Sequence, residues 1–130
     1  MFFFSTLFGR SREVKRLDDA LRSAGLHPAL VPDAVKITTL KLLDEAGHGA
    51  SPDLPACALA AEILTYCALG DHEFCQERGK NAANAAQTRL EVALEVGNNL
   101  DARLVLLAMH AGLIRVSLID RYDLHAAGEA

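Results

Sequence analysis

The pattern of apolar and polar positions is most unusual between Pro55 and Gly70, where the chain reads PACALAAEILTYCALG. Only Glu62, Thr65 and the hydroxyl group of Tyr66 are clearly polar, so apolar residues occupy every face of the helix that this stretch predicts. A helix that is apolar all round must be buried among other helices. With a glutamate in its middle, the stretch is also too short for a membrane span, which needs about 20 apolar residues. We therefore expect a central helix around which the rest of the chain packs.

Two amphipathic helices are predicted before this stretch. Ser11 is placed to cap a helix that ends at Gly25, because a serine hydroxyl satisfies amides at a helix start and glycine readily ends a helix. Asp33 is placed to cap a second helix over residues 34–46, whose apolar positions leave Lys36 on the outer side. Each helix should therefore turn one face to the core and one to water.

After the central helix the chain changes direction within very few residues. Gly70 ends that helix and Asp71 caps the next one, so the two should meet in a hairpin or a sharp corner. Gly79 then interrupts the chain before a longer helix over residues 80–96. Small and apolar residues form the predicted inner face of that longer helix, namely Ala82, Ala86, Leu90, Ala93 and Leu94.

The C-terminal part predicts a second apolar helix. Asp101 is placed to cap it, and residues 104–114 are apolar on most faces. Residues 114–119 then alternate between apolar and polar, which is the period of a strand. A lone strand has no partner with which to form a ladder, so we expect a helix that continues towards Tyr122. Residues 126–130 should form a frayed tail.

Composition supports the same architecture. Alanine and leucine dominate while valine and isoleucine are few, and this balance favours helices over strands. The chain of 130 residues has the size of one domain. We expect residues 1–130 to form a single all-α domain, a compact bundle of five or six helices with residues 56–69 and 102–113 as its buried inner pair. The apolar fraction of 51% indicates a surface kept for a partner or for a second copy.

The N-terminal segment, residues 1–10, is rich in phenylalanine and is followed by basic residues. Two interpretations are open for its rings. They can dock on the protein body or on a second subunit, or they can bind a membrane surface with the basic residues on lipid phosphates. We favour docking in a homodimer, because one short aromatic segment binds membranes only marginally. The expected interface residues are Phe2, Phe3, Phe4 and Phe8.

Charge and cysteine content narrow the function classes. Residues 1–41 carry a net charge of +3 and the remainder −7, which together give −4. An acidic body lacks the basic face that nucleic-acid-binding proteins present, so we expect no nucleic-acid partner. The three cysteines have no metal-binding or disulfide-forming spacing and are expected to be reduced. No basic region precedes the opening phenylalanines, so a signal peptide is not indicated and a cytoplasmic location is expected.

Established catalytic motifs do not occur in the chain. The pair Gly79-Lys80 resembles the end of a phosphate-binding loop, but the first glycine and the final serine or threonine are missing. Residues 71–77 are the densest reactive cluster, in which His72 and Cys75 stand three apart and could share a metal. Two ligands are fewer than zinc needs, and polar residues in the first turn of a capped helix explain the cluster without function. We expect no metal and no cofactor.

Glu62 and His110 lie in the two most apolar helices, and Tyr66 lies one turn after Glu62. If the fold brings the three together, they could form a proton-transfer group in a pocket. The simpler interpretation is that Glu62 reaches the surface and His110 hydrogen-bonds a backbone carbonyl.

Two functions therefore remain for the chain. One is a small cytoplasmic interaction or regulatory domain that self-associates, and the other is a helical-bundle enzyme or ligand binder that uses Glu62, Tyr66 and His110. We favour the interaction domain, because no motif supports enzymatic activity.

Overall fold

The computed structural model describes residues 11–124, and these residues form six α-helices and no strand. This confirms the predicted all-α helical bundle. In chain order the helices are α2 (Arg12–Ala24), α3 (Asp33–Leu43), α4 (Leu54–Arg78), α5 (Lys80–Val96), α6 (Leu100–His110) and α7 (Val116–Tyr122). Two single turns accompany them, a 3-10 turn, η1 (Pro28–Leu30), and a π turn, η2 (Asp44–His48).

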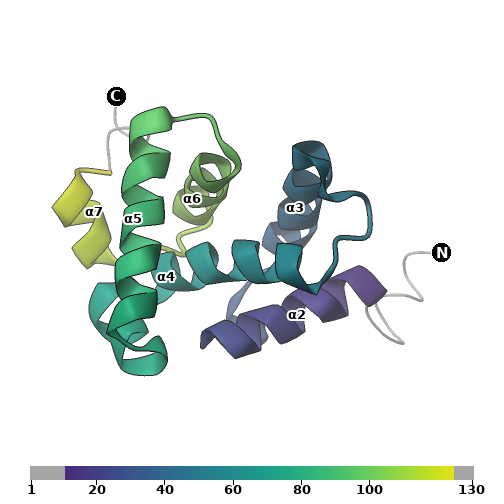
Figure 1. The fold of residues 1–130 in the computed structure, drawn as a ribbon, viewed down its shortest axis with the longest axis horizontal. Helices are drawn as coiled ribbons and strands as arrows, with labels where there is room; N and C mark the ends of the chain where they lie inside the picture. The colour runs from purple at the N-terminus through teal and green to yellow at the C-terminus, as the bar shows by residue number, and fades with distance from the viewer. Residues whose placement is uncertain (1–10, 125–130) are drawn as a thin grey trace.

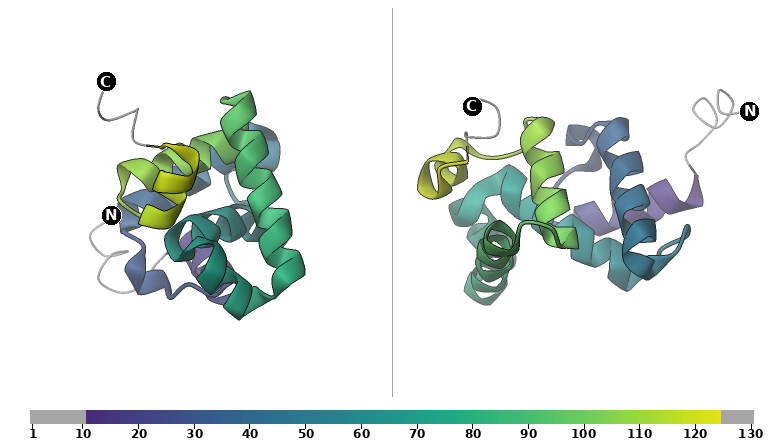
Figure 2. Two further views of the ribbon diagram at one scale, coloured as in Figure 1. Left: turned by 90° about the vertical axis from the view of Figure 1, so that its left-hand side faces the viewer. Right: turned by 90° about the horizontal axis from the view of Figure 1, so that it is seen from above.

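In Figure 1 the first half of α4 runs through the middle of the bundle, with α2 below it and α3 and α6 above it, while α5 crosses its left-hand end. The start of α2 and helix α7 lie at opposite ends of the long axis, and the view from above shows the same separation (Figure 2). α7 packs against α4. The apolar stretch that the sequence marks as central is therefore central in space as well.

Helix α4 separates two groups of buried apolar side chains and contributes to both. Ala60, Ile63 and Cys67 belong to the group shared with α5 and α6, and Cys57 and Ala61 to the group shared with α2, η1 and α3. Alanines recur in the first group, and their short side chains allow the helix axes to approach closely. The buried alanines of that group are Ala56, Ala60, Ala83, Ala86, Ala93 and Ala108.

The first two helices follow the predicted boundaries in part. The Ser11 hydroxyl accepts a hydrogen bond from the amide of Val14 at 3.2 Å, and Gly25 ends α2 with a φ of 110°. The expected cap of α3 is wrong, because Asp33 is already helical and Pro32 stands at the cap position. α3 also ends earlier than predicted, since the chain continues from it as the π turn η2.

Lys36, predicted to face outward, is buried between α2 and α3. Its side chain is 2% exposed, and its ammonium nitrogen lies 2.9 Å from a carboxylate oxygen of Asp18. A second carboxylate, that of Asp33, lies 4.0 Å away and is mostly exposed. An ammonium group can be buried when a carboxylate lies beside it. The prediction failed because the spacing of residues along α3 does not show that α2 supplies this carboxylate.

Gly70 turns the chain sharply inside α4, as the sequence predicts. Its φ of 84° and ψ of 167° are not helical, although helix continues directly on both sides. The carbonyl of Cys67, freed by this break, accepts a hydrogen bond from the amide of Arg115 at 2.8 Å. Asp71 was expected to cap the second half of the helix, but its carboxylate instead accepts a hydrogen bond from the hydroxyl of Tyr66 at 2.7 Å. We call this part of the fold the α4 corner.

Helix α5 has the predicted bounds of 80–96 and a slightly different inner face. Its buried residues include Ala83 instead of the expected Ala82, and Leu94 is 38% exposed. The cap of the following helix was also assigned to the wrong residue. The side-chain oxygen of Asn99 accepts a hydrogen bond from the amide of Ala102 at 2.8 Å, so Asn99 caps α6 in place of Asp101.

Helix α6 is buried on one face only, which corrects the expectation of a second wholly buried helix. Leu104, Val105 and Ala108 are buried, whereas Leu106 is 46% exposed and His110 is exposed. α3, α4 and α5 pack against α6 but leave its outer face in contact with water despite its apolar sequence. The chain then turns at residues 111–115, so the expected continuous helix is wrong. Residues 116–122 form α7 as a separate helix, and residues 114–119 contain no strand.

Among residues 11–124, α4 is the one helix whose length and apolar content would allow it to cross a membrane. More than half of its most apolar stretch is buried inside the protein, and the core helix of a bundle meets the same criterion. The break at Gly70 leaves residues 54–69 as one straight helix of about 24 Å at 1.5 Å per residue, shorter than a bilayer core of about 30 Å.

Candidate functional site

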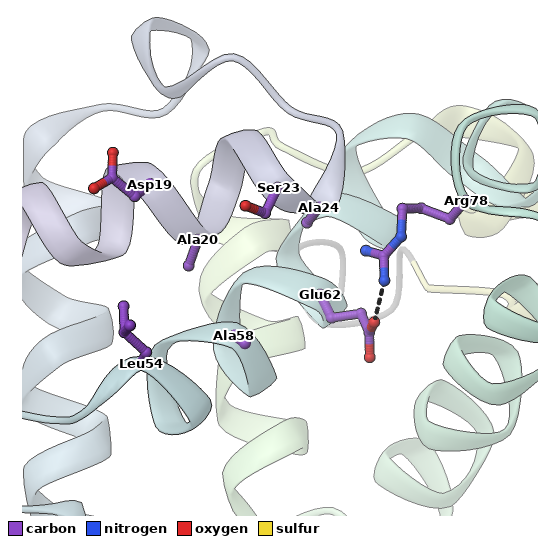
Figure 3. Close-up of a pocket in the computed structure, with 8 residues that line it drawn as sticks. All are labelled: Asp19, Ala20, Ser23, Ala24, Leu54, Ala58, Glu62 and Arg78. Atoms are coloured by element: carbon purple, nitrogen blue, oxygen red, sulfur yellow. Dashed lines mark hydrogen bonds and ion pairs between the residues drawn. The ribbon is translucent and has the colours of Figure 1, made fainter.

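A hollow of about 440 Å³ lies between α2 and α4 and contains Glu62, the first of the predicted site residues. Figure 3 shows its layout, with Leu54 and the Glu62–Arg78 pair on its α4 side and residues of α2 facing them. Alanine side chains account for much of the wall, so the space exists because small residues face each other. Its lining is Asp19, Ala20, Ser23, Ala24, Leu54, Ala58, Glu62 and Arg78. We call it the α2–α4 hollow.

The carboxylate of Glu62 is held between two arginines. One of its oxygens lies 3.1 Å from a guanidinium nitrogen of Arg78, and the other lies 3.4 Å from one of Arg89. Arg89 also makes a two-point contact with Asp101, at 2.7 and 3.0 Å, and donates to the carbonyl of Leu59 at 2.9 Å. This chain of ion pairs ties the middle of α4 to its own end, to α5 and to α6. Its evident role is to fix the helices.

Tyr66 has a different partner and a different surrounding. Its ring is fully buried and meets Phe74 edge to face at 5.4 Å between ring centres. Its hydroxyl donates to Asp71, and burial together with this hydrogen bond raises the pKa of the Tyr66 hydroxyl well above its usual range. The hydroxyl therefore keeps its proton at neutral pH and is a poor proton-transfer group.

His110 is exposed at the end of α6 and takes no part in a polar contact with Glu62 or Tyr66. Within residues 11–124, no hydrogen bond or ion pair joins any two of these three predicted residues. Part of the simpler interpretation agrees with this arrangement, because Glu62 does reach the surface, with 29% of its side chain exposed. The expected hydrogen bond from His110 to a backbone carbonyl is absent from these described residues.

The weaker metal candidates lie on the second half of α4. His72 is exposed and Cys75 is partly buried. Within the part of the chain that the structure describes, no three histidine, cysteine, aspartate or glutamate residues are grouped so that they could hold a metal ion.

The cysteines are unbridged, and two of them are buried in the core. Removal from water raises the pKa of the Cys67 thiol to about 12 and raises that of Cys57 as well. Since the thiolate is the reactive form, both thiols behave as small apolar core residues at neutral pH.

A second hollow, of about 480 Å³, lies beside the α4 corner and was not predicted from the sequence. It contains the two most exposed large apolar side chains of the described residues, Leu30 at 63% and Val116 at 64%. Leu30 follows a proline and Val116 lies in the segment whose pattern is ambiguous, so both stand outside the regular apolar stripes of the long helices. That placement is the only sign of the groove in the sequence. The lining is Leu26, Leu30, Ala68, Leu69, Glu73, Gly112, Leu113, Ile114, Arg115 and Val116. We call it the corner groove.

The predicted interface residues Phe2, Phe3, Phe4 and Phe8 lie outside the described residues. The two hollows described above are a space with the Glu62–Arg78 ion pair on one side and an apolar groove with two exposed side chains. Neither places a nucleophile beside a base. Comparison with known proteins finds no matching family model, no matching curated protein and no matching solved structure.

Proposed function

We propose that this protein is a small cytoplasmic interaction domain that self-associates as a homodimer. The observation that carries the proposal is the corner groove. Single exposed apolar side chains are normal on a protein surface, but Leu30 and Val116 are the two most exposed of all those described and line the same hollow. Contiguous apolar area of this kind costs free energy in water and is reduced when a second protein surface covers it.

The contacts of the predicted polar residues support an interaction domain over an enzyme. Glu62 is occupied by Arg78 and Arg89, and Tyr66 is occupied by Asp71. His110, at the end of α6, is engaged with neither of them. The enzyme or ligand-binder alternative therefore lacks the contact among Glu62, Tyr66 and His110 on which it depends.

The state of the cysteines supports the proposed location. Cys57 and Cys67 are buried without a bridging partner, as is common in proteins of a reducing compartment. The homodimer is favoured over an unknown partner because the chain itself supplies aromatic residues that an apolar groove would bind.

The test is the molar mass of the full chain by light scattering over a series of concentrations. We expect the mass to rise from 14.0 kDa towards twice that value with increasing concentration. The double variant Leu30→Glu/Val116→Glu should stay closer to the monomer mass, because two charges in the groove would have to be desolvated. Val92→Glu is the matched control, since Val92 is 45% exposed on α5 and does not line the groove.

A chain that stays monomeric at every concentration would refute the proposed function. A dimer that the groove variant leaves intact, with the same mass as the control, would show that self-association uses another surface and would remove the groove from the argument. Circular dichroism of each variant verifies that the helical fold is retained.

A further inference from the structure

We propose that the corner groove binds the aromatic N-terminal segment, residues 2–8, of a second copy of the chain. This inference rests on the proposed self-association and names the two surfaces that meet. One surface is described by the structure, and the other is known from its sequence and from the point where it joins α2.

The groove is mostly apolar, and the two charged residues that line it are already paired with each other. Three separate parts of the chain line it, namely η1 with the residue after α2, the α4 corner, and the turn between α6 and α7. Its two charged lining residues, Glu73 and Arg115, form an ion pair at 2.6 Å. Because these charges neutralise each other, the groove selects for an apolar occupant and offers no vacant charge to a polar ligand.

The groove is also held in shape before anything binds. Arg115 donates its amide to the carbonyl of Cys67 at 2.8 Å, and the amide of Leu113 donates to the carbonyl of Ala108 at 2.8 Å. The side chain of Arg115 reaches the carbonyl of Ala68 at 3.4 Å. A surface that is already ordered loses little conformational freedom on binding, so more of the contact energy appears as affinity.

The chain contains an occupant of matching chemistry. Four of its five phenylalanines fall within the first eight residues. Each ring can bury about 150–250 Å², and burial of apolar area is worth about 25 cal/mol per Å². Two rings in the groove would therefore supply several kcal/mol before the costs of association.

Distance favours the groove of a partner over the chain's own groove. The segment joins α2 at Ser11, whereas the groove begins just past the other end of α2, with Leu26. Helix α2 is about 20 Å long at 1.5 Å per residue, and Phe8 can reach only about 10 Å from Ser11 at 3.3–3.6 Å per residue. Phe8 therefore cannot enter its own groove, whereas Phe4, about 25 Å from Ser11 when extended, can reach that far. Only the groove of a partner can take Phe8 together with the earlier rings. In a twofold dimer with antiparallel α2 helices, each Ser11 faces the groove end of the other copy.

Charge agrees with this arrangement. The basic residues Arg10 and Arg12 directly follow the phenylalanines. Near the groove, the exposed side chain of Glu77 lies beside Gly25. Basic residues that follow the docked rings would meet this acidic edge, which raises the association rate most at low salt.

The first experiment removes residues 1–9 and measures molar mass by light scattering beside the full chain. We expect the deletion to raise the dissociation constant of the dimer at least tenfold, which corresponds to about 1.4 kcal/mol. The deletion removes no part of the described helices, so circular dichroism should still show a folded helical protein. Val92→Glu in the full chain is the control, because it keeps all four rings and does not alter the groove.

The second experiment tests which groove is occupied. One protein carries Phe4→Cys and the other carries Val116→Cys, both in a Cys75→Ser background, and a tag on one distinguishes the mixed dimer by mass. After mixing and mild oxidation, we expect a mixed disulfide, because each protein has only one accessible thiol and the pair can form only between copies. Phe4→Cys mixed with Val92→Cys is the matched control and should give little of this product.

The outcomes separate the inference from the proposed function. An undiminished dimer after deletion of residues 1–9, or equal cross-linking to Val92→Cys, would overturn the inference while self-association stands. A full chain that is monomeric at all concentrations would overturn both. A monomer that sediments with anionic lipid vesicles through its first nine residues would overturn both and assign the rings to a membrane surface.

Discussion

The substitution Asp18→Ala removes the carboxylate that lies closest to the ammonium group of Lys36 between α2 and α3. The two charged atoms are 2.9 Å apart, and the side chains are 10% and 2% exposed. The variant therefore leaves a positive charge in a place from which water is largely excluded. The carboxylate of Asp33 remains at 4.0 Å, but it is 59% exposed and compensates only weakly.

The expected loss follows from the cost of an uncompensated buried charge. Removing one member of a buried ion pair typically costs 3–5 kcal/mol, and we expect about 3 kcal/mol here because Asp33 remains nearby. That is a large part of the roughly 5–15 kcal/mol that stabilises a typical domain. Replacing both members with apolar residues, Asp18→Leu with Lys36→Met, should restore stability to within about 1 kcal/mol of the native chain.

The free energy of unfolding of each variant is measured by urea titration, with circular dichroism as the signal. The slopes of the transitions are compared to verify two-state behaviour. The matched control is Asp19→Ala, one residue along the same helix, where the carboxylate is 71% exposed and pairs with Arg22 on the surface. That control should lose at most about 1 kcal/mol. If Asp18→Ala and Asp19→Ala lose the same free energy of unfolding, the pair is not a buried one and the reasoning is wrong.

Three further predictions concern the core. Gly70→Ala should destabilise the fold by about 1–3 kcal/mol in urea unfolding, because its φ is 84° and an added Cβ would lie 3.1 Å from a neighbouring side chain. Gly79 has a similar φ but no atom near the position of an added Cβ. Gly79→Ala therefore measures the backbone strain without the steric contact. Leu64→Ala should cost about 2–5 kcal/mol by leaving a cavity, whereas Leu106→Ala on the exposed face should cost under about 1 kcal/mol; equal losses would contradict the assigned core. Folding raises the pKa of the Cys67 thiol from 9.0 to about 12, so the unfolded chain loses this proton at lower pH than the folded one. The free energy of unfolding should therefore fall as pH rises between these values, and it should fall less steeply in Cys67→Ala.

Features fixed by neighbouring residues were predictable from the sequence. Ser11 and Gly25 bound α2 as expected, and glycines bound α5 on both sides, because capping depends on a few adjacent backbone groups. The same reasoning fails where two suitable residues stand close together. Asn99 and Asp101 can both cap a helix, and only the position of Arg89, which binds Asp101, decides between them.

Features fixed by distant residues were not predictable. Glu62 is paired with Arg78 and Arg89, which lie 16 and 27 residues further along the chain. No periodicity within residues 54–69 shows that the fold brings these two arginines beside Glu62. The exposure of α6 has the same origin, since an apolar helix is buried only to the extent that other elements cover it. The corner groove likewise forms from three segments that are separate in sequence.

The hydrogen bond from Arg115 to the carbonyl of Cys67 has a consequence for the order in which the protein can be made. It closes the end of the central helix with a residue near the far end of the chain, 2.8 Å away in space. While the ribosome is still adding α6, that carbonyl lacks its partner amide, and Gly70 lacks the side chains of Arg115 and Ser117 that lie beside it in the finished protein. α2, α3 and the first half of α4 can associate early, but the bundle closes only when residue 115 has emerged. A nascent chain stalled before that point should therefore remain open to proteases at its middle.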